Sequence, residues 1–395
     1  MGHSIPFICL IAILVVLSNA QVSFAHESRE EQMAKCDRLL IRKEWRTLED
    51  GEKAEWVGAV KCLASIRHQR LSLSRDQSVL DGKRSLYDDF SYSHASLENS
   101  THRNAYFLPW RTSTSMPLMS ASKELRMHLH MYMYDTYRKT DRWFTHLFDS
   151  SLRRTCGYTG PTPYWDWSRD HANLFASPVF DDSPEQGLGG TGDCESSDCT
   201  VTTGALTGDD FQLAWPIPHS LRRNLTLITG WYPDERPQNE TLGPETVCHA
   251  IDSTTGDFFT FQRAMSALHN HVHNFVGGDL AGDCPGTLPE EDCQDMAMSF
   301  TPNDPLFWLH HAQLDRLWNV WQRQHPSNFA AFSGMPLVPH NMTDPHYDAD
   351  ARVLVDEPMF FDVQSVPVAP RTLFDIETWP LCYRYAEEEE WGGDT

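Results

Sequence analysis

Two segments of this chain place histidines inside apolar helical sequence, and they constrain the fold more than any other feature. His269 and His273 are four residues apart in a run that predicts a helix over Phe258 to Val276, closed by Gly277-Gly278 as a C-cap. Residues four apart lie on one face of a helix, so both imidazoles can reach one metal ion. His271 points to another face, and we expect it not to be a ligand.

His310 and His311 lie in a second helical segment, which we expect to follow Pro305 and to run to about Gln324. The segment is rich in Leu, Phe and Trp, where an unsatisfied polar group costs a few kcal/mol. A lone buried histidine usually bonds a carbonyl, whereas an adjacent pair in such a segment indicates a metal ligand. Taken alone, the spacing of His269 and His273 also occurs in zinc hydrolases and by chance; the second pair favours a metal centre shared by two helices.

Upstream segments supply two more histidines, His94 after Tyr-Asp-Asp-Phe-Ser-Tyr-Ser and His102 before Arg-Asn-Ala-Tyr-Phe-Leu-Pro-Trp. Pro-Tyr-Trp-Asp-Trp at 163–167 and Tyr-Arg-Tyr at 383–385 follow in order. With these motifs, the chain from about Cys36 to Tyr385 resembles the tyrosinase and catechol oxidase family, the type 3 copper proteins, and in particular its short secreted fungal members.

The resemblance implies a mainly α fold, with a four-helix bundle core that holds a dicopper centre between antiparallel helices, and with loops and a few short β-strands around it. Neutral imidazoles suit both Cu(I) and Cu(II), and three of them leave positions open on the metal. The implied activity is oxidation of o-diphenols (catechols) to o-quinones by O2, with ortho-hydroxylation of monophenols in the tyrosinase branch. Carried over by motif, the copper A ligands are His94 and His102, and the copper B ligands are His269, His273 and His311.

Other residues are expected around the metals. In the family, the residue after the first copper B histidine helps to position a water that deprotonates monophenols; here it is Asn270. Its partner is a Glu about nine residues before that histidine, where this chain has Thr260, with Gln262 as the nearest polar alternative. Neither is a general base, so we expect a diphenolase with weak monophenolase activity. Met298 is expected to shade copper A or to pack in the core, and His310 to line the substrate pocket beside the ligands.

The third copper A histidine of the family is replaced by Arg111, and a guanidinium cannot coordinate copper. The sequence that follows this histidine in the family resumes at Arg142, and the intervening segment contains five of the 13 Met residues. We interpret residues 111–141 as a retained intron, because codon degeneracy allows splicing to join Trp110 to a histidine followed by Arg142. The alternatives are a real insertion, in which His128 or His130 is the ligand, and a broken copper A site.

The N-terminus predicts export. Residues 1–25 read as a signal peptide, with an apolar run from Phe7 to Leu17 and cleavage after Ala20 or Ala25. We therefore expect a secreted, extracellular protein with no membrane contact after cleavage. Four N-glycosylation acceptors agree with this route: Asn99, Asn224, Asn239 and Asn341.

Nine cysteines follow the signal, so at least one is expected to be unpaired or bonded to another molecule. Cys194 and Cys199 are close enough in sequence to close a loop, as are Cys284 and Cys293. No Cys-x-x-Cys pair occurs, which argues against a thiolate metal site and leaves metal binding to histidine.

Composition limits the partners and the domain count. With 55 acidic against 32 basic residues the net charge is −23, which disfavours nucleic acid as a partner. The family resemblance leads us to expect small phenols as substrates.

We predict one domain over 26–386 and a solvated acidic tail over 387–395. Within the domain we predict an opening pair of helices over 30–75, a surface excursion from Ser183 to Asp210, and short strands beyond Pro336.

Two other functions use the same residues. A hemocyanin-like oxygen carrier, or a catalytically impaired copper protein, would keep the pocket without turnover. Carriers usually shield their coppers with a further domain, and only about ten residues follow Tyr385. A zinc hydrolase would use His269 and His273 alone and would leave the other histidines unexplained.

Overall fold

The computed structural model describes residues 36–68, 85–96, 142–228, 236–289, 296–333, 355–356, 358–359, 361 and 364–386. The predicted signal peptide, the segment 111–141 and the acidic tail lie outside these residues, as do His102, His128, His130, Asn99 and Asn341. None of the helices within the described ranges is both long enough and apolar enough to cross a bilayer.

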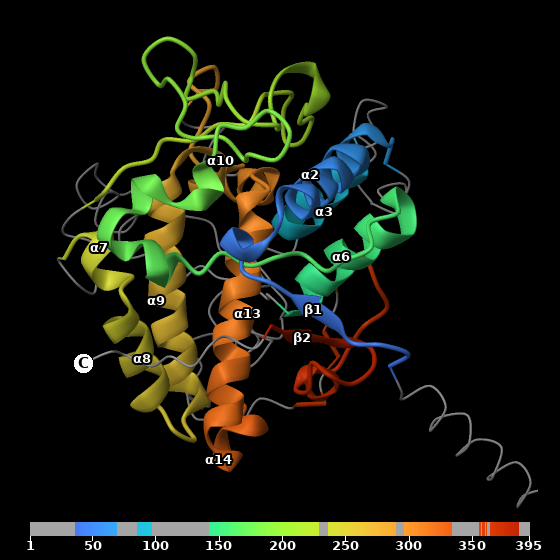
Figure 1. Cartoon of the computed structure of the whole chain (residues 1–395), viewed down its shortest axis with the longest axis vertical. Helices are drawn as coiled ribbons and strands as arrows, with labels where there is room; N and C mark the ends of the chain where they lie inside the picture. Colours follow the sequence, from blue (N-terminus) through green and yellow to red (C-terminus); the bar gives the residue numbers. More distant parts are fainter. Residues whose placement is uncertain are drawn as a thin grey trace, which may run out of the picture.

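The core is helical, as predicted. Helix α2 (Asp50–Ser65) packs on α3 (Leu86–Ser96) and α6 (Arg142–Cys156), while α13 (Leu306–Gln324) contacts both α6 and α9 (Phe258–Val276). Figure 1 shows α9 and α13 running side by side through the molecule. The remaining short helices are η1 (Trp45–Thr47), η4 (Trp167–Ala176), η5 (Pro178–Phe180), η6 (Gly208–Asp210), α7 (Gln238–Thr241), α8 (Pro244–Asp252), α10 (Gly278–Ala281), α12 (Ala297–Phe300), η7 (Thr301–Asn303), α14 (Pro326–Phe329) and η8 (Pro370–Leu373).

Aromatic side chains join α3, α6 and α13. The rings of Phe148 and Trp308 stack with centroids 3.8 Å apart, and Phe90 meets Phe144, Phe148 and Trp308 edge-on at 5.4 to 5.6 Å. Offset and edge-to-face contacts of this kind stabilise a core beyond the area they bury. These four aromatic residues therefore fix the relative positions of the three helices.

The two histidine-bearing helices have the predicted bounds. Helix α9 begins where the Asp257 carboxylate accepts a hydrogen bond from the Thr260 amide, and it ends at Gly277, whose φ of 64° favours glycine. Helix α13 begins directly after Pro305. Both predictions were confirmed because strong sequence signals mark these ends.

The predicted opening pair of helices is wrong. Within the described residues 36–68, α2 is the one α-helix; Leu40–Arg42 is strand β1, which pairs in parallel with β2 (Tyr383–Tyr385). The apolar residues before α2 pack against the other end of the chain, and that long-range pairing overrides the local helical spacing. Beyond Pro336, the described residues contain β2 and an isolated bridge between Met359 and Val368, in agreement with short strands there.

A buried ion network ties both chain ends to the core. The Asp315 carboxylate on α13 accepts hydrogen bonds from Arg142 (Nε to Oδ1, 2.5 Å), from Tyr385 (2.6 Å) and from Tyr383, with Arg42 at 3.8 Å. Burial raises the pKa of Asp315, but the two guanidiniums outweigh it, so the pKa lies below its usual value. The carboxylate is therefore charged and paired.

The disulfides agree with the cysteine count. Cys194 pairs with Cys199 as predicted, and two further bonds join distant segments: Cys36 with Cys382, and Cys62 with Cys156. Cys248 is the free cysteine among the described residues, and Cys284 is disulfide-bonded while Cys293 lies outside them.

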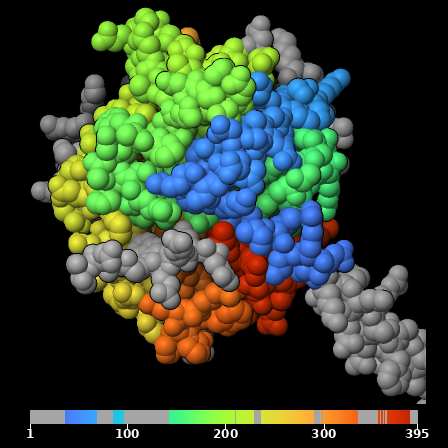
Figure 2. Space-filling model, in the orientation of Figure 1, coloured from blue at the N-terminus to red at the C-terminus, as the bar shows by residue number. Residues whose placement is uncertain are grey.

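Figure 2 shows the predicted excursion as a raised green surface at the top of the molecule, although Leu188 and Leu206 are buried within it.

Candidate metal centre

Four buried histidines from two helices form the candidate centre. His269 and His273 of α9 and His310 and His311 of α13 each offer a ring nitrogen, and these four nitrogens lie within 4.8 Å of one another. Their side chains are at most 7% exposed. The structure thus brings together the two histidine pairs that the sequence singled out, although they are almost 40 residues apart.

The rings are in mutual contact. The centroids of His269 and His273 are 4.0 Å apart, and His269 lies 4.9 Å from both His310 and His311. Such contacts between charged imidazoles would be repulsive, so the arrangement favours neutral rings. His271, predicted not to be a ligand, is buried but is not a member of this cluster of described residues.

One backbone carbonyl selects the tautomer of His273. The His273 Nδ1 atom lies 2.6 Å from the carbonyl oxygen of Leu280 in α10. Since a carbonyl only accepts, Nδ1 carries the proton and Nε2 keeps its lone pair. An outer acceptor of this kind orients a metal-binding imidazole and increases its basicity. Sequence reasoning missed this carbonyl, because a backbone acceptor leaves no residue-type signal.

His94 reaches the same region from α3. Its ring lies 5.7 Å from that of Phe307, and Phe307 in turn stacks on His311 with centroids 3.9 Å apart. The Phe307 ring therefore separates the predicted copper A histidine from a predicted copper B histidine. Nothing in the sequence pattern distinguished Phe307 from the other core aromatics.

The two α13 histidines differ in what surrounds them. His311 lies on the Phe307 side, toward His94, whereas the nearest aromatic ring to His310 outside the cluster is Trp167, at 6.5 Å. Both remain within reach of His269. His310 and His311 are equally close to His269, so the choice of His311 as ligand stays a prediction that rests on the family motif.

The start of α6 lies near the predicted copper A histidine His94. Phe144 lies 6.4 Å from His94, ring to ring. His146 follows Phe144 by two positions and therefore lies on another face of the helix. His146 instead stacks on Trp143 at 4.8 Å, and burial lowers its pKa to about 3. His146 is thus on the wrong face to replace the missing ligand.

The residues compared with the monophenol-activating pair of the family lie in different surroundings. Thr260 is exposed and its hydroxyl donates to Asp257, so it belongs to the start of α9 rather than to the centre. Gln262 is buried and seven residues before His269, which puts both on one helix face. Asn270 is half-buried beside His269. Met298 belongs to α12, and its side chain, like His102 and Arg111, lies outside the described residues.

The donor set fits copper. The cluster consists of imidazoles alone, with a backbone carbonyl fixing one tautomer, and imidazole is a ligand suited to copper as well as to zinc. Burial excludes water around the ligands. The described residues therefore include the three histidines predicted to bind copper B and one of those predicted to bind copper A, His94.

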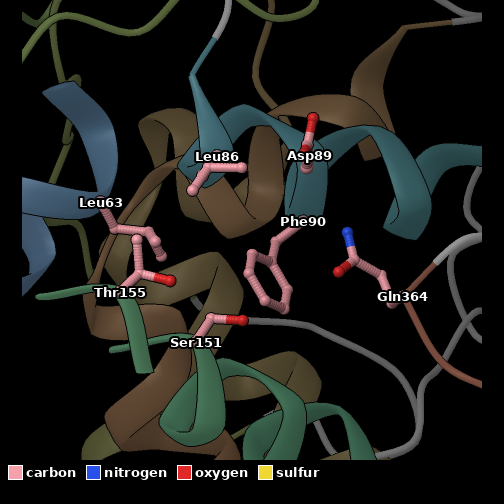
Figure 3. Close-up of a pocket in the computed structure, with 7 residues that line it drawn as sticks. All are labelled: Leu63, Leu86, Asp89, Phe90, Ser151, Thr155 and Gln364. Carbon is pink, nitrogen blue, oxygen red and sulfur yellow. The ribbon is translucent and has the colours of Figure 1, made fainter. Parts of the chain in front are cut away.

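A small pocket elsewhere has a different character. Figure 3 shows Leu63 of α2, Phe90 of α3, Ser151 and Thr155 of α6, and Gln364 around it. No histidine is among the described residues that line it. Its one metal-binding side chain among the described lining residues is the Asp89 carboxylate, so we do not place the copper centre there.

The family model for the common central domain of tyrosinase matches residues 141–324, from the start of α6 to the end of α13. Over these residues the chain resembles the tyrosinase family. The tyrosinase-like protein phomQ1 of Diaporthe leptostromiformis is 28% identical and covers 89% of this chain and 78% of its own length. The N-acetyl-6-hydroxytryptophan oxidase ivoB of Emericella nidulans is 26% identical over 95% of this chain and 99% of its own length.

A solved tyrosinase-family fold is also similar. A polyphenol oxidase variant from Thermothelomyces thermophila superimposes with a TM-score of 0.59 and 22% identity, covering 94% of this chain and 96% of that one. At this identity the likeness shows the fold alone. It confirms the helical core described above.

Proposed function

We propose that this protein is a secreted copper oxidase that converts o-diphenols to o-quinones with O2. The observation that carries the proposal is the buried cluster of His269, His273, His310 and His311 in a chain that resembles the tyrosinase family. Two bound coppers would supply O2 binding and electron transfer: each catechol loses two electrons and two protons, and O2 takes up four of each to give two waters.

The ligand roles follow from the family motif. His269, His273 and His311 would hold copper B, with the Leu280 carbonyl setting the orientation of His273. His94 and His102 would hold copper A. The buried rings exclude water, and the tautomer fixed at His273 keeps Nε2 available as a ligand.

The third copper A ligand would come from splicing out residues 111–141. Two observations support this proposal: the family model match begins at residue 141, and the position before Arg142 would share the α6 face that carries Phe144 toward His94. A spliced histidine there would complete three ligands. Sequencing the transcript across Trp110 to Arg142 tests this; mature message that always retains the segment would rule it out.

We propose that diphenols are the main substrates. Thr260 is exposed and bonded to Asp257, so the family's base is missing at this position. Hydroxylation of monophenols needs a group that can take the phenolic proton. Oxygen uptake with a monophenol should be much slower than with the matching catechol, and comparable rates would overturn this part of the proposal.

The natural substrate is an aromatic compound with adjacent hydroxyls. A relative from Emericella nidulans is named as an N-acetyl-6-hydroxytryptophan oxidase, so phenols on larger ring systems belong in the substrate panel beside simple catechols. Three disulfides among the described residues support an oxidising, extracellular compartment.

The alternative is an oxygen-binding or catalytically impaired copper protein, favoured by Arg111 if the segment is retained in the mature chain. Metal analysis combined with oxygen uptake on catechol distinguishes the two. The oxidase should contain two coppers per chain and produce quinone. Copper without quinone formation would favour the alternative, and zinc would favour a hydrolase.

A further inference from the structure

A segment that follows the surface excursion, residues 222–226, contacts both helices of the proposed copper B site. Residues 222–226 run along the end of α9: the Asn224 amide donates to the Val276 carbonyl at 3.0 Å, and the Thr226 amide donates to Phe275 at 2.9 Å. Two consecutive arginines, Arg222 and Arg223, begin this segment, and both are almost completely buried. Figure 1 shows the excursion at the end of the molecule where α10 lies.

Arg222 holds α10 through Asp279. The Arg222 guanidinium donates to Asp279 Oδ1 from Nε (3.0 Å) and Nη2 (2.8 Å), and its backbone amide donates to Oδ2 (2.9 Å). The Asp279 amide donates back to the Arg222 carbonyl at 3.0 Å. Asp279 is fully buried, so this bidentate pair has a fixed geometry with little water to compete for its bonds.

This turn of α10 is the one that orients His273. Leu280, whose carbonyl accepts from His273 Nδ1, directly follows Asp279. A helix of four residues is not stable on its own, so contacts with the rest of the protein fix its position. Backbone contact is close as well: a Cβ atom at Gly278 would lie 2.3 Å from the Arg222 carbonyl oxygen.

Arg223 holds the start of α13 in the same way. Its guanidinium donates to the two Asp304 oxygens at 2.6 and 2.7 Å, and Asp304 also accepts from the Leu306 amide at 2.9 Å. The other end of the guanidinium donates to the carbonyls of Leu188 and Gly189 in the excursion. The first turn of α13, one turn before His310 and His311, is thereby fixed to the excursion.

We propose that Arg222 and Arg223 position the copper B histidines from outside the bundle. Arg222 acts through Asp279 on the carbonyl that orients His273, and Arg223 acts through Asp304 on the turn of α13 that precedes His311. Adjacent residues of an extended segment point to opposite sides, which is why one dipeptide reaches both helices. The inference rests on the proposed copper centre, and it gives the excursion a role in metal binding.

The test compares copper affinity with fold stability. Asp279→Asn removes the charge that pairs with Arg222 but keeps the side-chain shape, and Asp304→Asn does the same for Arg223. Asp149→Asn is the control: Asp149 is equally buried and bonds Arg42 and the Thr162 amide at 2.7 Å, but it contacts no proposed copper ligand. Copper retained against a graded series of chelators is measured for the full chain, together with the urea midpoint of the copper-free protein.

We expect Asp279→Asn to weaken one copper site by about 10-fold to 100-fold, the usual effect of losing an outer partner of a ligand. Asp304→Asn should weaken the same site, whereas Asp149→Asn should lower the urea midpoint and leave copper affinity within about twofold of the parent. If Asp279→Asn does not fold, Arg222→Lys keeps the charge and should weaken the site by about tenfold.

Each contrary result has one meaning. Wild-type copper affinity in the variants of Asp279 and Asp304 would overturn the positioning role, and so would an equal loss in the Asp149 control. A parent protein that binds no copper would instead overturn the proposed function. The readout is copper binding, so the inference does not depend on catalytic activity.

Discussion

Replacing Arg142 by methionine probes the ion network that joins α6 to α13. Arg142 is fully buried, and its guanidinium donates to Asp315 at 2.5 Å, to Gln322 at 3.0 Å and to the Leu373 carbonyl at 2.7 Å. It also lies 3.7 Å from the ring centre of Trp318. Methionine keeps the apolar stem against this ring but removes every donor.

The expected loss is about 3 kcal/mol. Removing one partner of a buried ion pair costs about 3–5 kcal/mol, because the other charge is left without compensation. Asp315 keeps Tyr383, Tyr385 and Arg42, which favours the lower end of that range. Against a total stability of about 5–15 kcal/mol, this is a large fraction.

Urea unfolding followed by tryptophan fluorescence measures this loss as a shift of the midpoint at an unchanged slope. Arg154→Met is the matched control, because Arg154 is an exposed arginine of the same helix and should change stability by no more than about 0.5 kcal/mol. If Arg142→Met were as stable as this control, the network would not hold α6 against α13 and the reasoning would fail.

Three further predictions concern the centre and its surroundings. His311→Ala should lose one copper per chain and quinone formation, whereas His310→Ala should keep both coppers; metal analysis of the two variants checks this. Burial lowers the pKa of His219, but the neighbouring Asp279 carboxylate raises it by more, so the pKa lies above its ordinary value. Protonated His219 therefore stabilises the fold fully below about pH 6.5, and this stabilisation is lost as the pH rises through the higher pKa of the folded state. In His219→Gln the urea midpoint should change less with pH between about pH 6 and pH 8 than in the parent protein. Gln262→Glu, on the His269 face, should raise the ratio of monophenol to catechol oxidation in oxygen-uptake assays, whereas Thr260→Glu should not.

The helices that carry the metal ligands were predictable from local sequence. Asp257 before α9, Gly277 after it and Pro305 before α13 mark their ends with strong, short-range signals. The histidine spacing then gave the shared face of α9, and the apolar setting of His310 and His311 indicated burial. These predictions depend on contacts within one or two helical turns.

The rest depends on contacts between distant segments. Leu40 forms a strand because it pairs with Tyr383 at the other end of the chain, and no local pattern contains that information. The Leu280 carbonyl is a backbone atom, and the partners of Arg222 and Arg223 lie 57 and 81 residues away. Sequence spacing identifies which residues bind a metal more readily than it identifies what orients them.

The central proposal is that this protein holds two coppers and oxidises catechols. The direct measurement is copper content per chain, combined with oxygen uptake on a catechol, for the protein encoded by the mature transcript. The account predicts two coppers per chain and quinone formation at the expense of O2. A chain that binds zinc in place of copper, or one that holds two coppers and forms no quinone, would contradict it.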